Sequence, residues 1–263
     1  YAMSKESTGK TLVVASVLSV VCSIALAAAV TLLKPIQDEN KALEKQRKIL
    51  AAAQVLPEGE GDKARVNQEF AKFQRYLVNL DTGEFREVKL DDPYDQRKAL
   101  KNSSLSMALT ADQDMAGLRR RAKEADIYVV RDAAGKIEKM VLPVSGYGLW
   151  STLYGYLVLK NDANTIMGVT FVEHAETPGL GGEVDNPKWK ALWINKQVYS
   201  ADGQTHFKII KGNVDPAKPD AIHQVDGLSG ATLTSNGVTN LVQFWMGDLG
   251  YKKFLSKVRE GGI

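Results

Sequence analysis

The hydrophobic pattern of the chain begins with a long apolar run near the N-terminus. Residues 11–33, TLVVASVLSVVCSIALAAAVTLL, contain no charged side chain. A helix of this length rises about 35 Å, which is enough to cross a hydrocarbon core of roughly 30 Å. The pattern therefore predicts a membrane-spanning helix over residues 11–33, preceded by a short N-terminal tail, residues 1–10.

The same run could belong to a cleaved signal peptide. Ala25, Leu26 and Ala27 have the small-x-small form of a cleavage site, and Lys5 and Lys10 form a modest basic region before it. A signal peptide, however, usually has an apolar core of about 7 to 15 residues. Because this run continues to Leu33, an uncleaved anchor is favoured.

Two segments of mixed polarity follow the apolar run. Residues 34–60 show a thin apolar stripe at helical spacing, which predicts a stalk helix and a linker, and the run PEGEGD at 57–62 ends the helix. Phe70, Phe73 and Leu77 recur at helical spacing, which predicts a second helix over 62–80. Residues 81–126 mix turns and short helices. We therefore expect 61–126 to be a helical or irregular accessory segment.

From Ile127 the pattern changes to short apolar runs separated by turns. IYVVR and KIEKMVLPV flank the turn DAAG, and YGYLVLK and TIMGVTFVEH flank NDAN, so two β-hairpins are predicted. HFKII is a further strand. NPKWKALWINKQVY reads as a helix, with Asn186 as N-cap and Pro187 at the first helical position. Residues 127–263 thus predict an α+β domain with a mixed β-sheet and flanking helices.

Composition excludes several classes of function. The chain carries 34 basic and 31 acidic residues, which is not the excess of positive charge that nucleic-acid binding requires. The one basic cluster, Arg119–Arg121, reads as a solvated face at the end of a helix. Cys22 is the only cysteine and lies in the apolar run, so the rest of the chain has no thiol for a metal or a nucleophile. The three histidines, at 174, 206 and 223, show no metal-ligand spacing.

Three loops rich in glycine or hydroxyl groups interrupt the predicted domain. They are SGYGLW at 145–150, HAETPGLGGEV at 174–184 and DGLSGATLTSNG at 226–237. Glycine allows close approach of the backbone to a ligand, or a positive φ angle, although hairpin turns use it too. None of the loops contains a dinucleotide fingerprint or a Walker A motif. Their proximity in sequence favours a ligand site.

The residues alone leave the chemistry of the third loop open. Ser229 in GLSGA resembles a hydrolase nucleophile elbow, but Ala231 replaces the final glycine of that motif. Thr232 could simply cap a helix that begins near Leu233. The start of that helix could also hold a phosphate, because free N–H groups and the helix dipole favour an anion there. A threonine at this place could carry the phosphate as an ester.

The third loop resembles a known modification motif. Residues 226–232, DGLSGAT, are similar to the flavinylation motif D-x-x-[ST]-G-A-[ST], and ETPGLG, residues 176–181, resembles the second signature of the FMN-binding domain family. With one N-terminal span, this pair resembles the C subunits of Na+-translocating NADH:quinone reductases. The G subunits of Rnf complexes share the motif, but the long segment 62–126 and the apolar run favour the first family.

The resemblance implies FMN bound covalently to Thr232 as a phosphoester, attached by a flavin transferase that takes FMN from FAD. It implies no catalytic residue and no metal ligand in this chain. The motif positions that the transferase reads are Asp226, Ser229, Gly230 and Ala231. The residues expected near the flavin, by motif or by proximity, are Glu176, Thr177, Gly179, Leu180, Gly181, Tyr147, Gly148, Leu149, Trp150, Leu233 and Thr234.

The resemblance also implies a place in a complex. An electron would pass from an iron–sulfur centre through this FMN to a flavin on the B subunit, and the A, B, D, E and F subunits and membrane lipid would be the partners. The chain alone would have no turnover. The family places the N-terminus in the cytoplasm and the domain in the periplasm, on the bacterial inner membrane. Counting basic residues beside the span gives the opposite orientation, but long domains escape that rule. The alternative is a non-catalytic, membrane-tethered binding domain.

Overall fold

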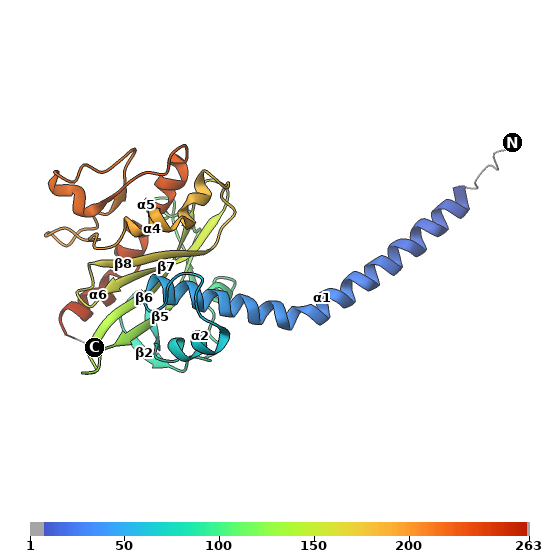
Figure 1. Ribbon diagram of the computed structural model, residues 1–263, viewed down its shortest axis with the longest axis horizontal. Coiled ribbons are helices and arrows are strands. Elements are labelled where there is room, and N and C mark those ends of the chain that lie inside the picture. Colours follow the sequence, from blue (N-terminus) through green and yellow to red (C-terminus); the bar gives the residue numbers. More distant parts are fainter. Residues whose placement is uncertain (1–7, 262–263) are drawn as a thin grey trace. The chain divides into compact units, whose positions relative to one another are not determined.

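A computed structural model describes residues 8–261 of the chain (Figure 1). The chain divides into two compact units between Lys45 and Gln46. Helix α1 is continuous from Thr8 to Ala52, with Pro35 inside it. Among the described residues it is the one helix long and apolar enough to cross a membrane. The predicted tail lies outside the described residues as far as residue 7, and its remainder is helical.

The second unit is built on a six-stranded antiparallel sheet with the order β2-β1-β5-β6-β7-β8. Both predicted hairpins are confirmed, as β5–β6 and β7–β8. A separate parallel pair, β9 with β10, makes the strand arrangement mixed. The bounds of these strands are β1 Gln74–Asn79, β2 Phe85–Val88, β5 Glu124–Arg131, β6 Ile137–Tyr147, β7 Thr152–Lys160, β8 Ile166–Glu173, β9 Lys208–Ile209 and β10 Gln224–Val225.

The helix predicted over 62–80 is wrong beyond Phe70. Helix α2 covers only Lys63–Phe70, and β1 follows it. The residues of β1 between its two ends are all buried, because both faces of the sheet are covered. Such a strand lacks the alternation that identifies strands, so its apolar spacing resembles that of a helix. The segment 61–126 therefore contributes two strands, β1 and β2, to the sheet.

The helix predicted from Asn186 is shorter than expected. The Asn186 side chain caps α4 by accepting a hydrogen bond from the backbone N–H of Lys188 at 2.9 Å, but α4 covers only Pro187–Ala191. The fully buried Trp193 packs against Phe207, and the chain turns at Asn195, which has φ +66°. Tertiary packing therefore ends the helix. The strand expected at HFKII is likewise reduced to the two residues of β9.

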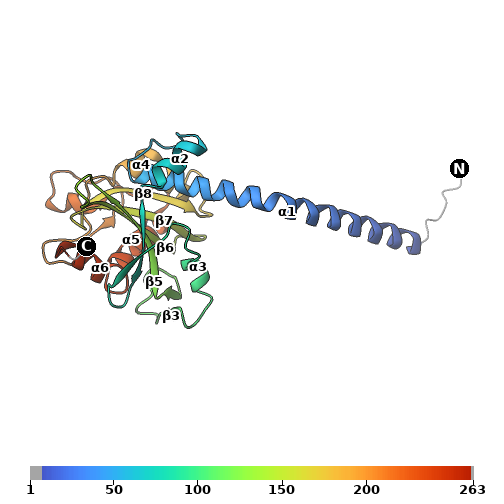
Figure 2. The ribbon, with the colours of Figure 1, turned by 90° about the horizontal axis from the view of Figure 1, so that it is seen from below.

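Helices cover both faces of the sheet (Figure 2). On one face, α5 (Thr232–Met246) packs on β6, and Trp245 Nε1 donates to the Ser145 carbonyl at 2.7 Å. Helix α6 (Lys252–Arg259) follows on that face, and Tyr251 before it donates to the Pro143 carbonyl at 2.7 Å. The other face is covered by the last turns of α1 and by α2, whose Phe70 meets Tyr128 of β5 edge to face. This packing brings the start of α5 to the end of β6.

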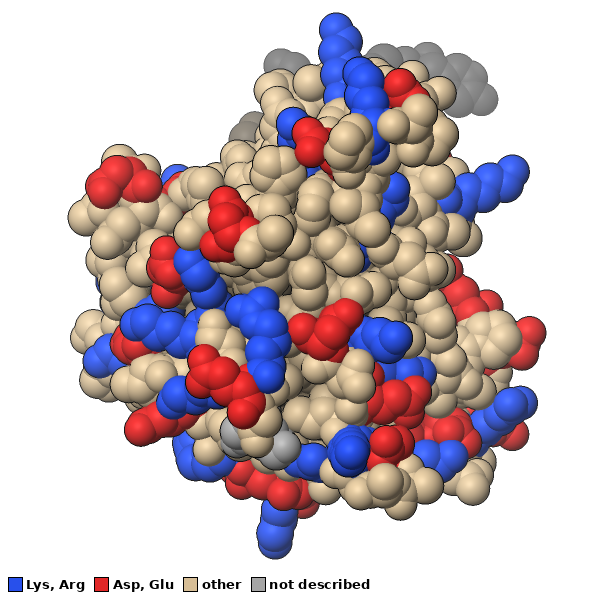
Figure 3. Space-filling view, turned by 90° about the vertical axis from the view of Figure 1, so that its left-hand side faces the viewer, with Lys and Arg blue, Asp and Glu red and all other residues tan. Residues whose placement is uncertain are grey.

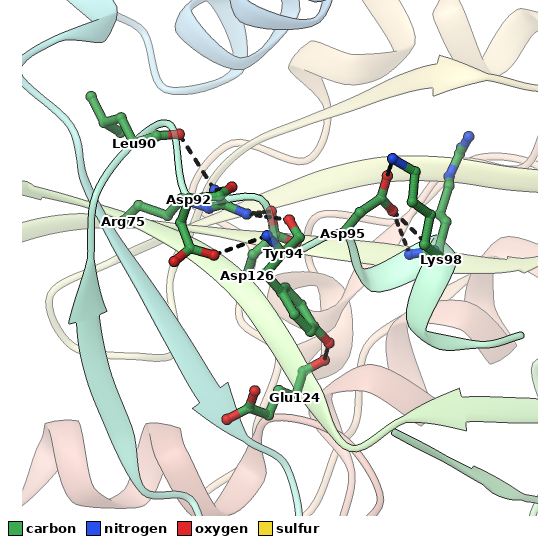
Figure 4. Close-up of polar contacts among 9 residues, drawn as sticks. Arg75, Leu90, Asp92, Tyr94, Asp95, Lys98, Glu124 and Asp126 are labelled. Atoms are coloured by element: carbon green, nitrogen blue, oxygen red, sulfur yellow. Dashed lines mark hydrogen bonds and ion pairs between the residues drawn. The ribbon is translucent and has the colours of Figure 1, made fainter. Parts of the chain in front are cut away.

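A buried arginine fixes the irregular segment after β2 (Figure 4). The Arg75 guanidinium donates to the carbonyls of Asp92 and Tyr94 at 2.7 Å each and pairs with Asp126 at 3.3 Å. Tyr94 in turn donates to the Glu124 carbonyl at 2.7 Å. This segment is therefore tied to β1 and β5. The short elements that complete the fold are α3 Gln96–Ala99, β3 Ser106–Ala108, β4 Arg120–Ala122, and the 3-10 helices η1 Gly181–Asp185 and η2 Pro219–His223.

The prediction that the basic cluster Arg119–Arg121 is a solvated face at the end of a helix is wrong. Arg121 is not part of a solvated helix face: it lies in β4, is buried, and donates to Asp81 and to the Leu249 carbonyl. A neighbour in sequence, Arg119, is exposed. On the face shown in Figure 3, Lys and Arg side chains lie among Asp and Glu side chains, so the two signs are interspersed there.

Candidate functional site

Three loops meet at the start of α5. The first continues from β6 into Gly148–Trp150, the second follows β8, and the third leads into α5. Gly237 of α5 lies directly against the first loop, since a Cβ atom there would be 2.3 Å from the Tyr147 carbonyl oxygen. Gly230 of the third loop lies against Leu180 of the second, at 2.9 Å by the same measure. The structure thus brings together the three loops that the sequence singled out.

The carboxylate of Glu176 joins these loops. Glu176 is only 5% exposed. Its Oε1 accepts from the backbone N–H groups of Leu149, Trp150 and Ser151 at 3.1, 2.9 and 3.2 Å. Its Oε2 accepts from the Thr234 hydroxyl at 2.7 Å. Three successive N–H groups form a concave anion site, and the chain fills it with its own carboxylate.

The hydrogen bonds decide the ionisation of Glu176. Burial raises the pKa of this carboxyl, but the hydrogen bonds from the Thr234 hydroxyl and from the N–H groups of Trp150, Leu149 and Ser151 outweigh it and lower the pKa below its ordinary value of 4.5. Glu176 is therefore ionised at neutral pH. The ordering of the three loops depends on a buried negative charge with no cation among its hydrogen-bond partners.

Acidification is expected to remove the stability that Glu176 contributes. Because its pKa is lower in the folded state, the contribution is complete above the unfolded value, near 4.5, and is lost as the pH falls through the folded value. The free energy of unfolding of the wild type should exceed that of Glu176→Gln at pH 7, and the gap should narrow below about pH 4.5. Urea denaturation of both proteins across this range measures the gap. A gap that is constant down to strongly acidic pH would contradict the assignment.

Two of the predicted site glycines pack around Glu176 rather than beside a ligand. A Cβ atom at Gly148 or at Gly181 would lie 2.7 Å from a carboxylate oxygen of Glu176, and at Gly181 also 2.6 Å from Thr234 Oγ1. Gly179 differs, because it has φ +76° and no atom within 4 Å of its Cβ position. It forms a turn with Thr177, whose carbonyl accepts from the Leu180 and Gly182 N–H groups. Open space in the second loop is therefore found at Gly179.

The start of α5 lacks a side-chain cap. The alternative in which Thr232 caps the helix is wrong: Thr232 is the first helical residue, and Ala231 occupies the N-cap position without a side-chain hydrogen bond. The first intrahelical bond runs from the Ser235 N–H to the Ala231 carbonyl at 3.0 Å. The N–H groups of Thr232, Leu233 and Thr234 therefore lie at the helix end that favours an anion.

The hydroxyl groups of the third loop separate into exposed and buried ones. Ser229 and Thr232 are exposed. Thr234 is fully buried and bonded to Glu176, and Ser235 is buried and accepts from the Leu228 N–H at 3.1 Å. No hydrogen bond among residues 8–261 joins Ser229 to a histidine, as a hydrolase would require. Thr232 is the exposed hydroxyl on the first turn of α5.

Large apolar side chains are exposed around this helix start. Trp150 is 65% exposed and Leu233 is 59% exposed, although side chains of this size are usually covered. A group of exposed apolar residues on a polar surface is typical of a binding site. We call these residues the apolar rim: Tyr147, Leu149, Trp150, Leu180 and Leu233.

Asp226, the first residue of the motif, holds the third loop in place. Its Oδ1 accepts from the Val214 N–H at 2.8 Å, and its carbonyl accepts from Trp189 Nε1 at 2.9 Å. Trp189, Val214 and Ser151 were not among the predicted site residues. They act through backbone groups or through distant contacts, and neither leaves a motif in the sequence.

The histidines do not gather at this site. His174 Nε2 lies 2.9 Å from Asp185 Oδ2, whereas the rings of His206 and His223 pack against each other elsewhere. Within the part of the chain that the structure describes, no group of three or more His, Cys, Asp or Glu residues is arranged to hold a metal ion.

A family model, curated relatives and a solved structure all match this chain. The family model of the FMN-binding domain matches residues 148–247, which contain the second and third loops and the Gly148–Trp150 part of the first. The chain is 49% identical to the C subunit of the Na+-translocating NADH-quinone reductase of Pseudomonas aeruginosa, over 98% of each chain. It is 45% identical to the C subunit from Yersinia pestis, over 99% of this chain and 96% of the relative. The crystal structure of Shewanella oneidensis NqrC has a TM-score of 0.76 at 37% identity, covering 84% of this chain and 99% of that one.

Proposed function

The chain belongs to the family of C subunits of the Na+-translocating NADH-quinone reductase, and on that premise we propose that it carries FMN joined through its phosphate to the Thr232 side chain. The family membership makes the chain a subunit of an enzyme complex, and the chain itself contains the FMN-binding domain. The covalent bond, its position and the path of the electron are the proposal. The observation that carries it is the exposed Thr232 hydroxyl at the first position of an uncapped helix.

The helix start suits a phosphate ester. An ester-linked phosphate keeps one negative charge, and the unpaired N–H groups of the first turn stabilise such a charge. The pocket then needs no arginine clamp. Attachment balances as a transfer from FAD: the Thr232 oxygen bonds to the phosphorus next to riboflavin, the bond between the two phosphates breaks, AMP leaves, and the hydroxyl proton is lost. A flavin transferase would perform this step.

The apolar rim suits the ring system of the flavin. Leu149 and Trp150 on one loop and Leu180 on another would cover the ring and exclude water from it. Gly230, with φ +70°, and Gly179, with φ +76°, keep the turns beside the rim free of side chains. FMN when bound supplies electron-transfer chemistry, which the protein positions and tunes. Nothing in this function requires a catalytic side chain.

The proposed position in the complex is supported by the family membership. We place α1 across the bacterial inner membrane, with the N-terminus in the cytoplasm and the domain in the periplasm. The A, B, D, E and F subunits and the surrounding lipid are the proposed partners. Thr232 would hold the FMN between an iron–sulfur centre and a flavin on the B subunit, where it would supply the chemistry of an electron relay. A covalent bond keeps the cofactor on a domain outside the cytoplasm, where free FMN would be lost.

Two alternatives are less well supported. The relatives reported above carry the name of the NADH-quinone reductase rather than of an Rnf complex. A tethered binding domain without a flavin would need Thr232 only as a helix cap, and Ala231 occupies that position.

The mass of one peptide tests the proposal. Protein produced together with a flavin transferase should yield a tryptic peptide, residues 212–252, that is heavier than its sequence by one FMN less one water. Fragmentation should place the added mass on Thr232. The same peptide from cells without the transferase is the control. An unmodified peptide from the assembled complex would refute the covalent flavin.

A further inference from the structure

We propose that Glu176 is the positioning residue of this flavin site, an inference that rests on the proposed function. The family resemblance implies that Glu176 lies near the flavin. In the structure the Glu176 carboxylate is bonded to the protein: the residue is 5% exposed, and both oxygens accept hydrogen bonds from protein groups. Glu176 therefore acts on the site through the groups that it holds.

The groups that donate hydrogen bonds to Glu176 belong to both parts of the site, the apolar rim and the start of α5. On one side, the bonded N–H groups belong to Leu149 and Trp150, whose side chains form part of the apolar rim. On the other side, Thr234 lies in the first turn of α5, two residues after the attachment position Thr232. One carboxylate thus sets the distance between the rim and the attachment position.

The surroundings of the Glu176 carboxylate favour an anion. All of its bonded neighbours are donors: the N–H groups of Leu149, Trp150 and Ser151, and the Thr234 hydroxyl. Hydrogen bonds to a charged acceptor are about twice as strong as neutral ones. Gly148 and Gly181 leave no room for a larger or displaced side chain, because their Cβ positions already lie 2.7 Å from the carboxylate oxygens.

A purely structural role and a positioning role make different predictions for Thr234. Thr234→Val keeps the shape and removes the hydroxyl that donates to Glu176, whereas Thr234→Ser keeps the hydroxyl. Thr239→Val is a matched control on the same helix, because Thr239 Oγ1 donates to the Ser235 carbonyl and accepts from the Ile209 N–H, and neither group is bonded to Glu176. Loss of a hydrogen bond at Thr239 should weaken the fold without moving the site.

The rate of flavin incorporation by purified transferase and FAD measures positioning. The incorporation reaction is run below the melting temperature of every variant. Samples taken at intervals are denatured, and their flavin fluorescence gives the amount incorporated. We expect a fall of about tenfold or more for Thr234→Val, since a hydrogen bond to a charged group is lost, and rates near wild type for Thr234→Ser and Thr239→Val. Equal rates for Thr234→Val and Thr239→Val would overturn the positioning role.

Chemical rescue tests the anion itself. Glu176→Ala opens a small cavity at the three N–H groups, and formate can enter it as a free carboxylate. Formate should raise the melting temperature of the unloaded variant and restore its rate of flavin incorporation, while leaving the wild type unchanged. If the variant does not fold even with formate, or folds and incorporates flavin at the wild-type rate without formate, the inference is wrong.

The two proposals fail in different ways. If wild-type protein takes up no flavin, the proposed function fails, yet formate can still stabilise unloaded Glu176→Ala and confirm the anion site. If the wild type takes up flavin and the Thr234 and Glu176 variants do so equally fast, only the positioning role fails.

Discussion

Replacement of Thr232 by leucine is expected to give a folded protein that takes up no covalent flavin. The side chain is exposed and makes no capping hydrogen bond, so its loss should change the free energy of unfolding by no more than about 0.5 kcal/mol. Leucine is a good helix former at the start of α5. The change removes the oxygen that forms the phosphoester. Flavin fluorescence of the denatured protein band should fall from strong to background, while the thermal melt stays near that of the wild type.

Two matched variants sharpen this result. Thr232→Ser keeps the hydroxyl and should keep at least part of the covalent flavin. Ser229→Ala removes the other exposed hydroxyl of the loop and should leave the phosphoester in place. Flavin that persists on Thr232→Leu would move the attachment to Ser229, because Thr234 and Ser235 are buried and hydrogen-bonded.

Local patterns in the sequence identified the elements whose cause is local. The hairpins β5–β6 and β7–β8 follow from short apolar runs on either side of turn residues. The cap at Asn186 follows from the side chain of that residue alone. The helix wrongly predicted over 62–80 has a non-local cause: β1 is buried on both faces, so its apolar residues do not alternate with polar ones. Burial of Arg121 is also non-local, because Asp81 and Leu249 lie far from it in sequence.

The candidate site also has features with a local cause in the sequence and features with a non-local cause. The three loops, and Thr232 as the proposed attachment position, could be found from motifs, because each motif is a short continuous stretch. The role of Glu176 could not, since its partner Thr234 is 58 residues away and the Leu149 N–H 27 residues away. The sequence also suggested that glycines admit a ligand, whereas Gly148 and Gly181 admit the Glu176 carboxylate. Composition shows which residues occur in a loop, and only the fold shows what each one faces.

A complex that contains the Thr232→Leu variant of this chain is expected to lose NADH-driven quinone reduction. In the proposed relay, the FMN of this chain lies between an iron–sulfur centre and the flavin of the B subunit, so its absence interrupts the only proposed path to quinone. The proposed relay puts NADH oxidation on another subunit, so a soluble artificial acceptor that takes electrons there should still be reduced at the wild-type rate. Purified complexes with matched amounts of every subunit provide both rates, and sodium uptake into vesicles should fall together with quinone reduction.

The pair of rates separates a broken relay from a damaged complex. Faulty assembly would lower both rates, whereas loss of one cofactor in the middle of the relay lowers only the quinone rate. The Thr232→Ser complex is the control, and its quinone rate should follow its content of covalent flavin. Quinone reduction at the wild-type rate by a complex in which this chain has no flavin would remove the chain from the path of the electron. The start of α5 would then serve assembly rather than electron transfer.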